Sequence, residues 1–346
     1  MKRIPTMKDV AKMAGVGTMT VSRFLNGSAT VSQETAEKVD QAIRALHYRP
    51  NQMARALRGQ RSHSIGLILP YLYDPFFASC AHAVTSVARE LGYTVLMTTS
   101  DEDPEIEASE TARMLQRYVE GLIVIPANQG KTRLTYSLLG DLPLVAFDRP
   151  VDLEGVDTIL VENAGGAKRM VEHLIGHGHS RIAFMGMSRN LYTIQERFQG
   201  YLQAMHKAGL KAEASFDCTS AEATRAVLEE HRQRPHPPTA YFTSNTLTSS
   251  FVLSEAQKLG LKIPDQIALA GFDDFFLADT LSPPLTVVRQ PYEEMGRTAA
   301  RQLFRRISGG GTQQKGACMV LPVELLLRQS CGCNTEHREQ RTESSS

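Results

Sequence analysis

Residues 6–26, TMKDVAKMAGVGTMTVSRFLN, are the stretch around which the rest of the chain is organised. Thr6 is a typical helix N-cap, and Asp9 stands three residues later, where a capping-box acid belongs. Apolar side chains then recur at positions 7, 10, 11 and 14, which is the spacing of one helix face. Gly15 suits the left-handed conformation that ends a helix. The stretch therefore predicts two short helices joined by a tight turn, a helix-turn-helix.

The second predicted helix, from about residue 18 onward, has an apolar side and a polar side. Val21, Phe24 and Leu25 belong to the apolar side and are expected to be buried. The other side carries short or hydrogen-bonding side chains, which suit base edges and phosphates in a major groove, namely Thr18, Met19, Ser22, Arg23 and Asn26. Any polar helical hairpin shares this spacing, so the charge of the flanking sequence has to decide.

The charge of the chain is divided between a basic head and an acidic body. Residues 1–63 hold eleven Lys and Arg against four Asp and Glu, a net charge of +7 with His neutral. The remaining residues hold 27 basic and 33 acidic side chains, so the overall value of +1 hides this division. A basic head attracts a polyanion through phosphate contacts and counterion release. We therefore expect the head to bind nucleic acid.

The sequence contains no apolar run that approaches the roughly 18 residues of a membrane span. The amino-terminal residues Met1-Lys2-Arg3 lead into the predicted helix-turn-helix, with no signal-peptide core between them. We therefore expect a cytoplasmic protein with no membrane partner.

Five cysteines are scattered along the chain, an odd number that is typical of reduced thiols. Cys331 and Cys333 form a Cys-Gly-Cys motif, which is compatible with a redox pair or with half of a metal site. No second ligand pair is apparent at metal-binding spacing in the sequence. We therefore predict no metal site, and a reduced, solvent-facing segment at this motif.

A third helix and a hinge follow the helix-turn-helix. Ser32 is the expected cap of the helix, which closes the head near Tyr48. After a break at residues 49–51, the segment 52–58 is long enough only for a marginal helix. We predict that this segment becomes helical on DNA, with Leu57 as a wedge in a minor-groove base step.

From residue 64 the sequence alternates between buried-type strands and helices. The expected strands are 65–69, 94–99, 121–126, 143–147, 181–186, 213–217, 238–243, 266–271 and 317–327. The expected helices are 75–92, 105–119, 131–139, 164–176, 194–209, 220–233, 246–259 and 291–307. Repeated units of this kind predict parallel sheets in two similar lobes, with a ligand cleft where the carboxyl ends of their strands face each other.

With the head, the hinge and the body in view, the chain resembles the lactose/galactose repressor (LacI/GalR) family over nearly its full length. The matching stretches include MKDVAKMAGVGTMTVSRFLNG, LHYRPNQMARALRG, HLIGHGHSRIAFMG and GLKIPDQIALAGFDD. The resemblance implies a small all-α helix-turn-helix headpiece, followed by a two-lobed α/β domain of the periplasmic-binding-protein type with doubly wound parallel sheets.

The resemblance also implies domain boundaries. The headpiece takes residues 1–49, the hinge helix and linker 50–62, the effector-binding and dimerisation domain 63–334, and a disordered tail 335–346. Within the large domain, the N-lobe takes about 63–161 and 292–322, and the C-lobe about 162–291 and 323–334.

The function implied by the resemblance is that of a homodimeric transcription factor on near-palindromic operator DNA. We expect a repressor of carbohydrate-utilisation genes, nucleoid-associated when bound, whose operator affinity is controlled by a sugar, sugar acid or sugar phosphate between the lobes. The alternative is a corepressor-dependent repressor that responds to a non-sugar metabolite. We expect no cofactor and no enzymatic activity, because the sequence shows no nucleophile elbow, phosphate loop or dinucleotide fingerprint.

The resemblance assigns DNA contacts residue by residue. The base-reading positions of the recognition helix are Thr18, Met19 and Arg23. Phosphate or supporting contacts fall to Thr6, Thr20, Ser22 and Asn26, and hinge contacts to Asn51, Ala54, Leu57 and Arg58. Because Met19 offers only apolar contact, we expect Arg23 to supply most of the hydrogen-bonded specificity.

The resemblance further places effector contacts at the strand ends, at Tyr73, Phe76, Asp148, Arg149, Arg189, Tyr192, Arg197, Asn245 and Asp273. Arg and Asp paired across a cleft can hydrogen-bond the vicinal hydroxyls of a sugar. The alternative role for each of these residues is a lobe–lobe ion pair or a surface charge. Thr246 stands where family members commonly have an acid. Since that carboxylate is lost and three arginines remain, we expect a pocket that leans positive and an anionic carbohydrate effector.

The absence of C-terminal heptads in the sequence favours a dimer over a tetramer. The predicted helix 75–92 carries Cys80, Val84 and Val87 along one side. This side is expected to belong either to the dimer interface or to the core.

Overall fold

The structure is a computed structural model that describes residues 5–25, 31–48, 61–127, 132–309 and 315–333. The chain divides into two compact units, residues 1–62 and residues 63–346. The predicted hinge segment 52–58 and the predicted tail 335–346 lie outside the described residues. Among the described residues, no helix combines the length and the apolar character that crossing a membrane requires.

The first unit contains three described helices, α1 (Met7–Ala14), α2 (Thr18–Leu25) and α3 (Gln33–Leu46). The predicted capping box of α1 is confirmed, because the carboxylate of Asp9 accepts the N–H of Thr6 at 2.8 Å. The predicted stop is confirmed as well, since Gly15 has φ of 66°. The three helices close a small core made of Val10, Ala11, Ala14, Val21, Val39 and Ala42.

The N-lobe of the second unit is built on a six-stranded sheet in the order β11-β5-β4-β3-β1-β2. Its strands are parallel and comprise β1 (Ser64–Leu69), β2 (Thr94–Thr99), β3 (Leu122–Val124), β4 (Leu144–Phe147), β5 (Asp157–Val161) and β11 (Cys318–Leu321). Its helices are α5 (Pro75–Glu90), α6 (Pro104–Gln116), α7 (Tyr136–Leu139) and α12 (Tyr292–Ser308).

The C-lobe repeats this plan in a second six-stranded sheet, in the order β12-β10-β9-β8-β6-β7. Its strands are β6 (Ile182–Met185), β7 (Glu213–Ser215), β8 (Ala240–Thr243), β9 (Ala268–Phe272), β10 (Thr286–Arg289) and β12 (Glu324–Leu326). Its helices are α8 (Asn163–Gly176), α9 (Tyr192–Lys207), α10 (Ala221–Arg232) and α11 (Thr246–Lys258). By position in the two sheets, β4 corresponds to β9 and β5 to β10.

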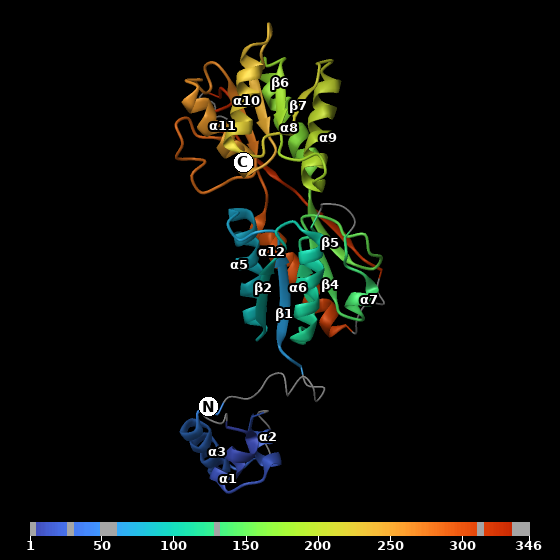
Figure 1. The fold of residues 1–346 in the computed structure, drawn as a ribbon, viewed down its shortest axis with the longest axis vertical. Helices are drawn as coiled ribbons and strands as arrows, with labels where there is room; N and C mark the ends of the chain where they lie inside the picture. Colours follow the sequence, from blue (N-terminus) through green and yellow to red (C-terminus); the bar gives the residue numbers. More distant parts are fainter. Residues whose placement is uncertain (1–4, 26–30, 49–60, 128–131, 310–314, 334–346) are drawn as a thin grey trace, which may run out of the picture. The chain divides into compact units, whose positions relative to one another are not determined.

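The chain passes between the lobes at residues 161–163, 289–292 and 321–324, so three crossings join the two sheets of the second unit (Figure 1). Three strand predictions need correction here. Strands β5 and β10 were not expected, and the strand expected at 317–327 is two strands, one in each sheet. Pro322 cannot donate to a sheet ladder, and the break falls there. Strand β12 also pairs antiparallel with β10.

The apolar side of α5 faces the core of the N-lobe. Cys80 and Val84 are fully buried, and Val87 is nearly so. The expectation that this side of the helix belongs to the core is therefore correct. The alternative, that it belongs to the dimer interface, is wrong for these three side chains.

A buried ion pair joins distant segments of the N-lobe. The guanidinium of Arg306, in α12, donates to both carboxylate oxygens of Asp157, at the start of β5. The same carboxylate accepts the side-chain amide of Gln302 at 2.6 Å and the backbone N–H of Ala317 at 2.7 Å. One acidic side chain thus holds β5, α12 and the residue before β11 together.

Candidate functional site

Helix α2 presents the predicted base-reading side chains to solvent. Thr18, Met19 and Arg23 are exposed, Met19 by 68%, whereas Val21 on the opposite side is fully buried. Thr20 and Ser22 are half-buried. This arrangement follows from the 3.6-residue period, since one side of a short helix must cover the core.

The remaining predicted DNA contacts stand as follows. Thr6 is exposed, and its hydroxyl donates to the carboxylate of Asp9 at 2.7 Å, within the capping box. Five predicted DNA contacts lie outside the described residues, namely Asn26, Asn51, Ala54, Leu57 and Arg58.

In the second unit, corresponding strands of the two lobes end in the same way. Strand β4 ends at Phe147 and is followed by Asp148, while β9 ends at Phe272 and is followed by Asp273. Both aspartates are buried and have positive φ, 66° and 77°. Non-glycine residues in this region cost of order 1–3 kcal/mol and gather at functional sites. The pair therefore marks the facing strand ends as a candidate site.

A buried arginine organises the C-lobe side of this site. Arg197, in α9, is 3% exposed and lies over the ring of Phe272, with the guanidinium carbon 3.8 Å from the ring centroid. Its Nε donates to the side-chain oxygen of Asn163 at 2.8 Å. Its Nη1 donates to the carbonyl of Ser244 at 2.7 Å and to Asp273 at 3.2 Å. The positive charge of Arg197 is thereby neutralised within the protein.

Several buried polar atoms beside Arg197 and Asp273 are left without hydrogen bonds. The side-chain nitrogen of Asn163, the hydroxyl of Ser244 and the side-chain oxygen of Gln290 have no partner among the described residues. Gln290 itself donates to Asp273 at 2.5 Å, so it belongs to the same network. Buried polar groups without partners are rare in proteins and are usually satisfied by water or a ligand. These atoms offer a donor and acceptors for one.

Two acids on the N-lobe side complete the arrangement. Burial raises the pKa of Asp148 to about 6, and Arg149 and Arg197 oppose that rise. Burial likewise raises the pKa of Asp74 to about 6, with Asp273 of the other lobe raising it further. Charges from both lobes therefore act on each other here. We call Asp74, Asp148, Asn163, Arg197, Ser244, Asp273 and Gln290 the strand-end cluster, because six of them follow strands of the two sheets and Arg197 of α9 bonds to three of those six.

Arg149 pairs with two acids, and its Nε lies 3.3 Å from the carboxylate of Asp148. Its guanidinium makes two hydrogen bonds to the buried carboxylate of Glu102, at 2.6 and 2.7 Å, and a third to the carbonyl of Pro126 at 3.1 Å. Two of the three arginines behind the expected positive pocket, Arg149 and Arg197, are therefore paired with acids. Glu102 neutralises Arg149 and Asp273 neutralises Arg197, while Asp74 and Asp148 add negative charge.

The other predicted effector contacts are dispersed. Tyr73 is 74% exposed, whereas Phe76 is buried with its ring edge-on to Tyr292. Arg189 is exposed, with its guanidinium 4.5 Å from the ring centroid of Phe216. Tyr192 is half-buried at the start of α9, and Asn245 caps α11 by accepting the N–H of Thr248 at 2.9 Å.

Sequence reasoning overlooked Asp74, Glu102, Asn163, Ser244 and Gln290 as members of this region. Ser244 directly follows the predicted strand 238–243, which is the signal by which it was open to detection, whereas Gln290 follows β10, a strand that the sequence did not predict. Glu102 carries no such signal, because its pairing with Arg149 depends on the fold.

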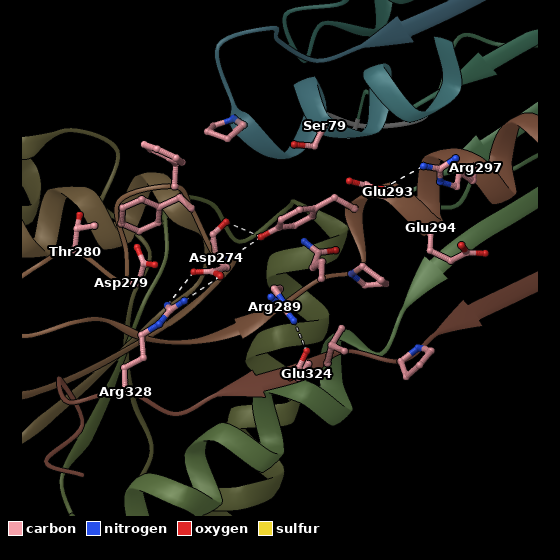
Figure 2. A pocket seen from close by; sticks show the side chains of 18 residues that line it. Ser79, Asp274, Asp279, Thr280, Arg289, Glu293, Glu294, Arg297, Glu324 and Arg328 are labelled. Atoms are coloured by element: carbon pink, nitrogen blue, oxygen red, sulfur yellow. Dashed lines mark hydrogen bonds and ion pairs between the residues drawn. The ribbon is translucent and has the colours of Figure 1, made fainter. Parts of the chain in front are cut away.

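A cavity of about 1260 Å³ opens beside the strand-end cluster and shares Gln290 with it (Figure 2). The charged side chains of its lining largely pair with one another. Arg328 bonds Asp274 at 2.9 Å, Arg289 bonds Glu324 at 2.5 Å, and Arg297 bonds Glu293 at 3.3 Å. None of the nine predicted effector residues lines this cavity. Its polar groups are therefore less available to a ligand than those of the cluster.

Comparison with known proteins adds to this geometry. Residues 6–51 match the family model "Bacterial regulatory proteins, lacI family", and residues 171–331 match "Periplasmic binding protein-like domain". The regulator DegA of Bacillus subtilis is 31% identical over 94% of this chain and 97% of its own. The chain belongs to the lacI family of bacterial regulatory proteins.

Other members of the lacI family are similar over comparable lengths. The ribose operon repressor of Halalkalibacterium halodurans is 35% identical, over 87% of this chain and 90% of its own. Among solved structures, the Lac repressor dimer bound to operator and the anti-inducer ONPF matches with a TM-score of 0.82 and 26% identity, over 95% of this chain and 99% of that one. The CelR–cellobiose complex matches with a TM-score of 0.67 and 30% identity, over 94% and 99%.

Membership of the lacI family confirms the fold expected from the sequence, a helix-turn-helix head and a two-lobed binding domain. The protein is a DNA-binding transcriptional regulator of the repressor type.

Proposed function

We propose that this regulator is controlled by a small, neutral, hydroxyl-rich metabolite, such as a sugar, held at the strand-end cluster. The observation that carries the proposal is a pair of buried aspartates, Asp148 and Asp273, at corresponding strand ends of the two lobes. The backbone of both adopts the left-handed conformation. Carboxylates accept hydrogen bonds from the hydroxyl groups of a sugar, and the unpartnered atoms of Asn163, Ser244 and Gln290 supply further hydrogen bonds.

The charges of the cluster favour a neutral ligand over an anionic one. Arg197 is paired with Asp273, and Arg149 is paired with Glu102. A sugar acid or sugar phosphate would therefore meet the carboxylates of Asp74 and Asp148, while the charges of Arg149 and Arg197 are already paired with acids. Two relatives support a carbohydrate, since one is named a ribose operon repressor and another was solved with cellobiose.

We further propose that the chain works as a homodimer on operator DNA, as the Lac repressor does in its dimer–operator structure. Binding of a ligand between the lobes changes operator affinity, and operator must then change ligand affinity by the same factor. An effector that releases the protein from DNA makes it an inducible repressor. An effector that tightens DNA binding makes it a corepressor-dependent one, the second candidate.

Calorimetry of the full chain tests the ligand class. D-ribose and cellobiose are titrated in parallel with ribose 5-phosphate and cellobionic acid. We expect binding within the neutral set, and a loss of about tenfold or more in Asp148→Asn, because a hydrogen bond to a charged group contributes about 1.5–3 kcal/mol. Asp141→Asn, an exposed aspartate outside the cluster, is the matched control and should bind as the wild type does. Tight binding of the anionic set alone would overturn the proposal.

A further inference from the structure

The terminal Cys-Gly-Cys motif is not the solvent-facing segment expected from the sequence. Cys331 is fully buried and Cys333 is half-buried. Both lie against the last turn of α8, where His173 and His177 are spaced four residues apart on one side of the helix. The second ligand pair that the sequence did not reveal is therefore supplied by a segment more than 150 residues away.

The four side chains converge on one point. The Nε2 of His173 is 3.4 Å from the sulfur of Cys331 and 3.4 Å from that of Cys333. The Nε2 of His177 is 3.3 Å from the sulfur of Cys333, and the two sulfurs are 3.3 Å apart. The four ligand atoms lie within 4.8 Å of one another.

The three sulfur–nitrogen separations, 3.3–3.4 Å, are close to the edges of a tetrahedral metal site, and the sulfur–sulfur distance of 3.3 Å is somewhat shorter than such an edge. With Zn–S near 2.3 Å and Zn–N near 2.0–2.1 Å, a tetrahedron has S–N edges of about 3.5 Å and an S–S edge of about 3.8 Å. A sulfur–sulfur bond, at about 2.05 Å, is much shorter than the observed distance between the two thiols. Two sulfur and two nitrogen ligands in a tetrahedron are typical of zinc.

We propose that His173, His177, Cys331 and Cys333 form a structural Zn²⁺ site that fastens residues 331–333 to α8. On binding, the two thiols release their protons to solvent and form two zinc–sulfur bonds. The two thiolates then balance the charge of the metal, which suits a partly buried site.

The surroundings of the site fit this role. The hydroxyl of Thr286 donates to the sulfur of Cys331 at 3.1 Å, a second-layer hydrogen bond of the kind that orients metal ligands. Gly332 has φ of 90°, which a residue with a side chain rarely adopts and which turns the second cysteine back toward the first. The N–H of Gly332 closes the turn on the carbonyl of Gln329 at 3.0 Å.

The site is separate from the strand-end cluster. Asn163 begins α8 at the cluster, and His173 stands ten residues further along the same helix, which corresponds to about 15 Å along its axis. The site holds four protein ligands and so leaves no open position for catalysis. Its role is therefore structural, in the C-lobe.

The test is metal binding by the full chain, purified under reducing conditions and titrated with Zn²⁺ alone. We expect about one zinc to bind per chain and zinc to raise the temperature at which the C-lobe unfolds. When Co²⁺ replaces Zn²⁺, we expect the near-ultraviolet charge-transfer absorption of a cobalt–thiolate bond. His177→Asn and Cys333→Ser should weaken zinc binding more than about tenfold, and Cys333→Ser should reduce the charge-transfer band.

His206→Asn and Cys318→Ser are the matched controls, since both side chains are exposed and lie outside the site. They should bind zinc as the wild type does. Because His177 is exposed, its variant should unfold at the same temperature as the wild type when a chelator is present, which separates metal binding from folding. Absence of zinc binding by the reduced wild type, or equal binding by the site variants and the controls, would overturn the proposal.

Discussion

Asp148 and Asp273 occupy corresponding positions in the two lobes, and both adopt a backbone conformation that favours glycine. Aspartate tolerates this conformation better than most residues but still at a cost. The carboxylate of Asp273 accepts hydrogen bonds from Arg197 and Gln290. That of Asp148 forms an ion pair at 3.3 Å with Arg149, whose terminal nitrogens donate to Glu102. At the residue scale, Asp148 is therefore the carboxylate more available to a ligand.

The raised pKa values of Asp74 and Asp148, both about 6, predict a pH-dependent effector affinity. Hydroxyl donors bind the ionised carboxylates, so affinity should fall as the pH drops through about 6. The unfolding free energy of the unliganded protein should change in the opposite sense. A carboxyl whose pKa is raised in the folded state stabilises the native state at low pH, and this contribution is lost as the pH rises. Calorimetry at about pH 5 and about pH 8 measures the first effect. A profile that is equally steep in the Asp74→Asn, Asp148→Asn double variant would contradict it.

The buried pair of Asp157 and Arg306 predicts a large stability effect. Asp157→Asn leaves the buried guanidinium without a counter-charge, so we expect a loss of about 3–5 kcal/mol in the unfolding free energy of the second unit. Adding Arg306→Met should recover part of that loss. Urea unfolding of the full chain measures both, and equal stability of the single variant and the wild type would rule this role out.

The same pair predicts loss of stability in acid. Burial alone raises the pKa of Asp157, but the hydrogen bonds from Arg306, Ala317 and Gln302 outweigh it, so the pKa is lowered from its ordinary value of 3.8. A lowered folded-state pKa contributes stability above the ordinary value, and that contribution disappears as the pH falls through the folded value. Asp157→Asn should therefore flatten the acid limb of the stability curve.

At the scale of elements, helix α2 allows a prediction about DNA reading. Arg23→Ala should weaken binding to the preferred operator by about 1–3 kcal/mol and relax base preference at the contacted position, because Arg commonly reads guanine through two hydrogen bonds. Selection of bound genomic fragments identifies the operator, and fluorescence anisotropy then compares the variant with Lys12→Ala, an exposed side chain of α1. An unchanged base preference in Arg23→Ala would count against this assignment.

The elements that the sequence predicts well are those with local signals. The turn of the helix-turn-helix depends on Thr6, Asp9 and Gly15, which lie within ten residues of one another. Strands β5 and β10 were missed because each follows a long irregular stretch, so the alternation of strands with helices that marked the others is absent there.

The candidate sites divide in the same way. Asp148, Arg197 and Asp273 stand in motifs that the sequence displays, and the structure brings them near one another. The partner of Arg149 is 47 residues away, and the cysteines meet two histidines from α8. Such pairings are set by tertiary structure, which explains why neither the partner of Arg149 nor the histidines beside the two cysteines were anticipated.

At the scale of the whole molecule, the division of charge between a basic head and an acidic body predicts that DNA binding and ligand binding respond differently to salt. The first 63 residues carry a net charge of +7 and the rest −6. Phosphate contacts by the head should make operator binding strongly dependent on salt, whereas the pairing of charges at the strand-end cluster should make effector binding nearly independent of it. Titrations of each ligand over a range of salt concentrations compare the two slopes, and equal slopes would contradict this division.

The central claim is that a ligand at the strand-end cluster controls DNA binding by α2. The most direct measurement is the operator affinity of the full chain, with and without a saturating neutral sugar identified by calorimetry. We predict a change of about 5- to 150-fold in the wild type, and a much smaller one in Asp148→Asn at the same sugar concentration. An operator affinity that the bound sugar leaves unchanged in the wild type would contradict the claim.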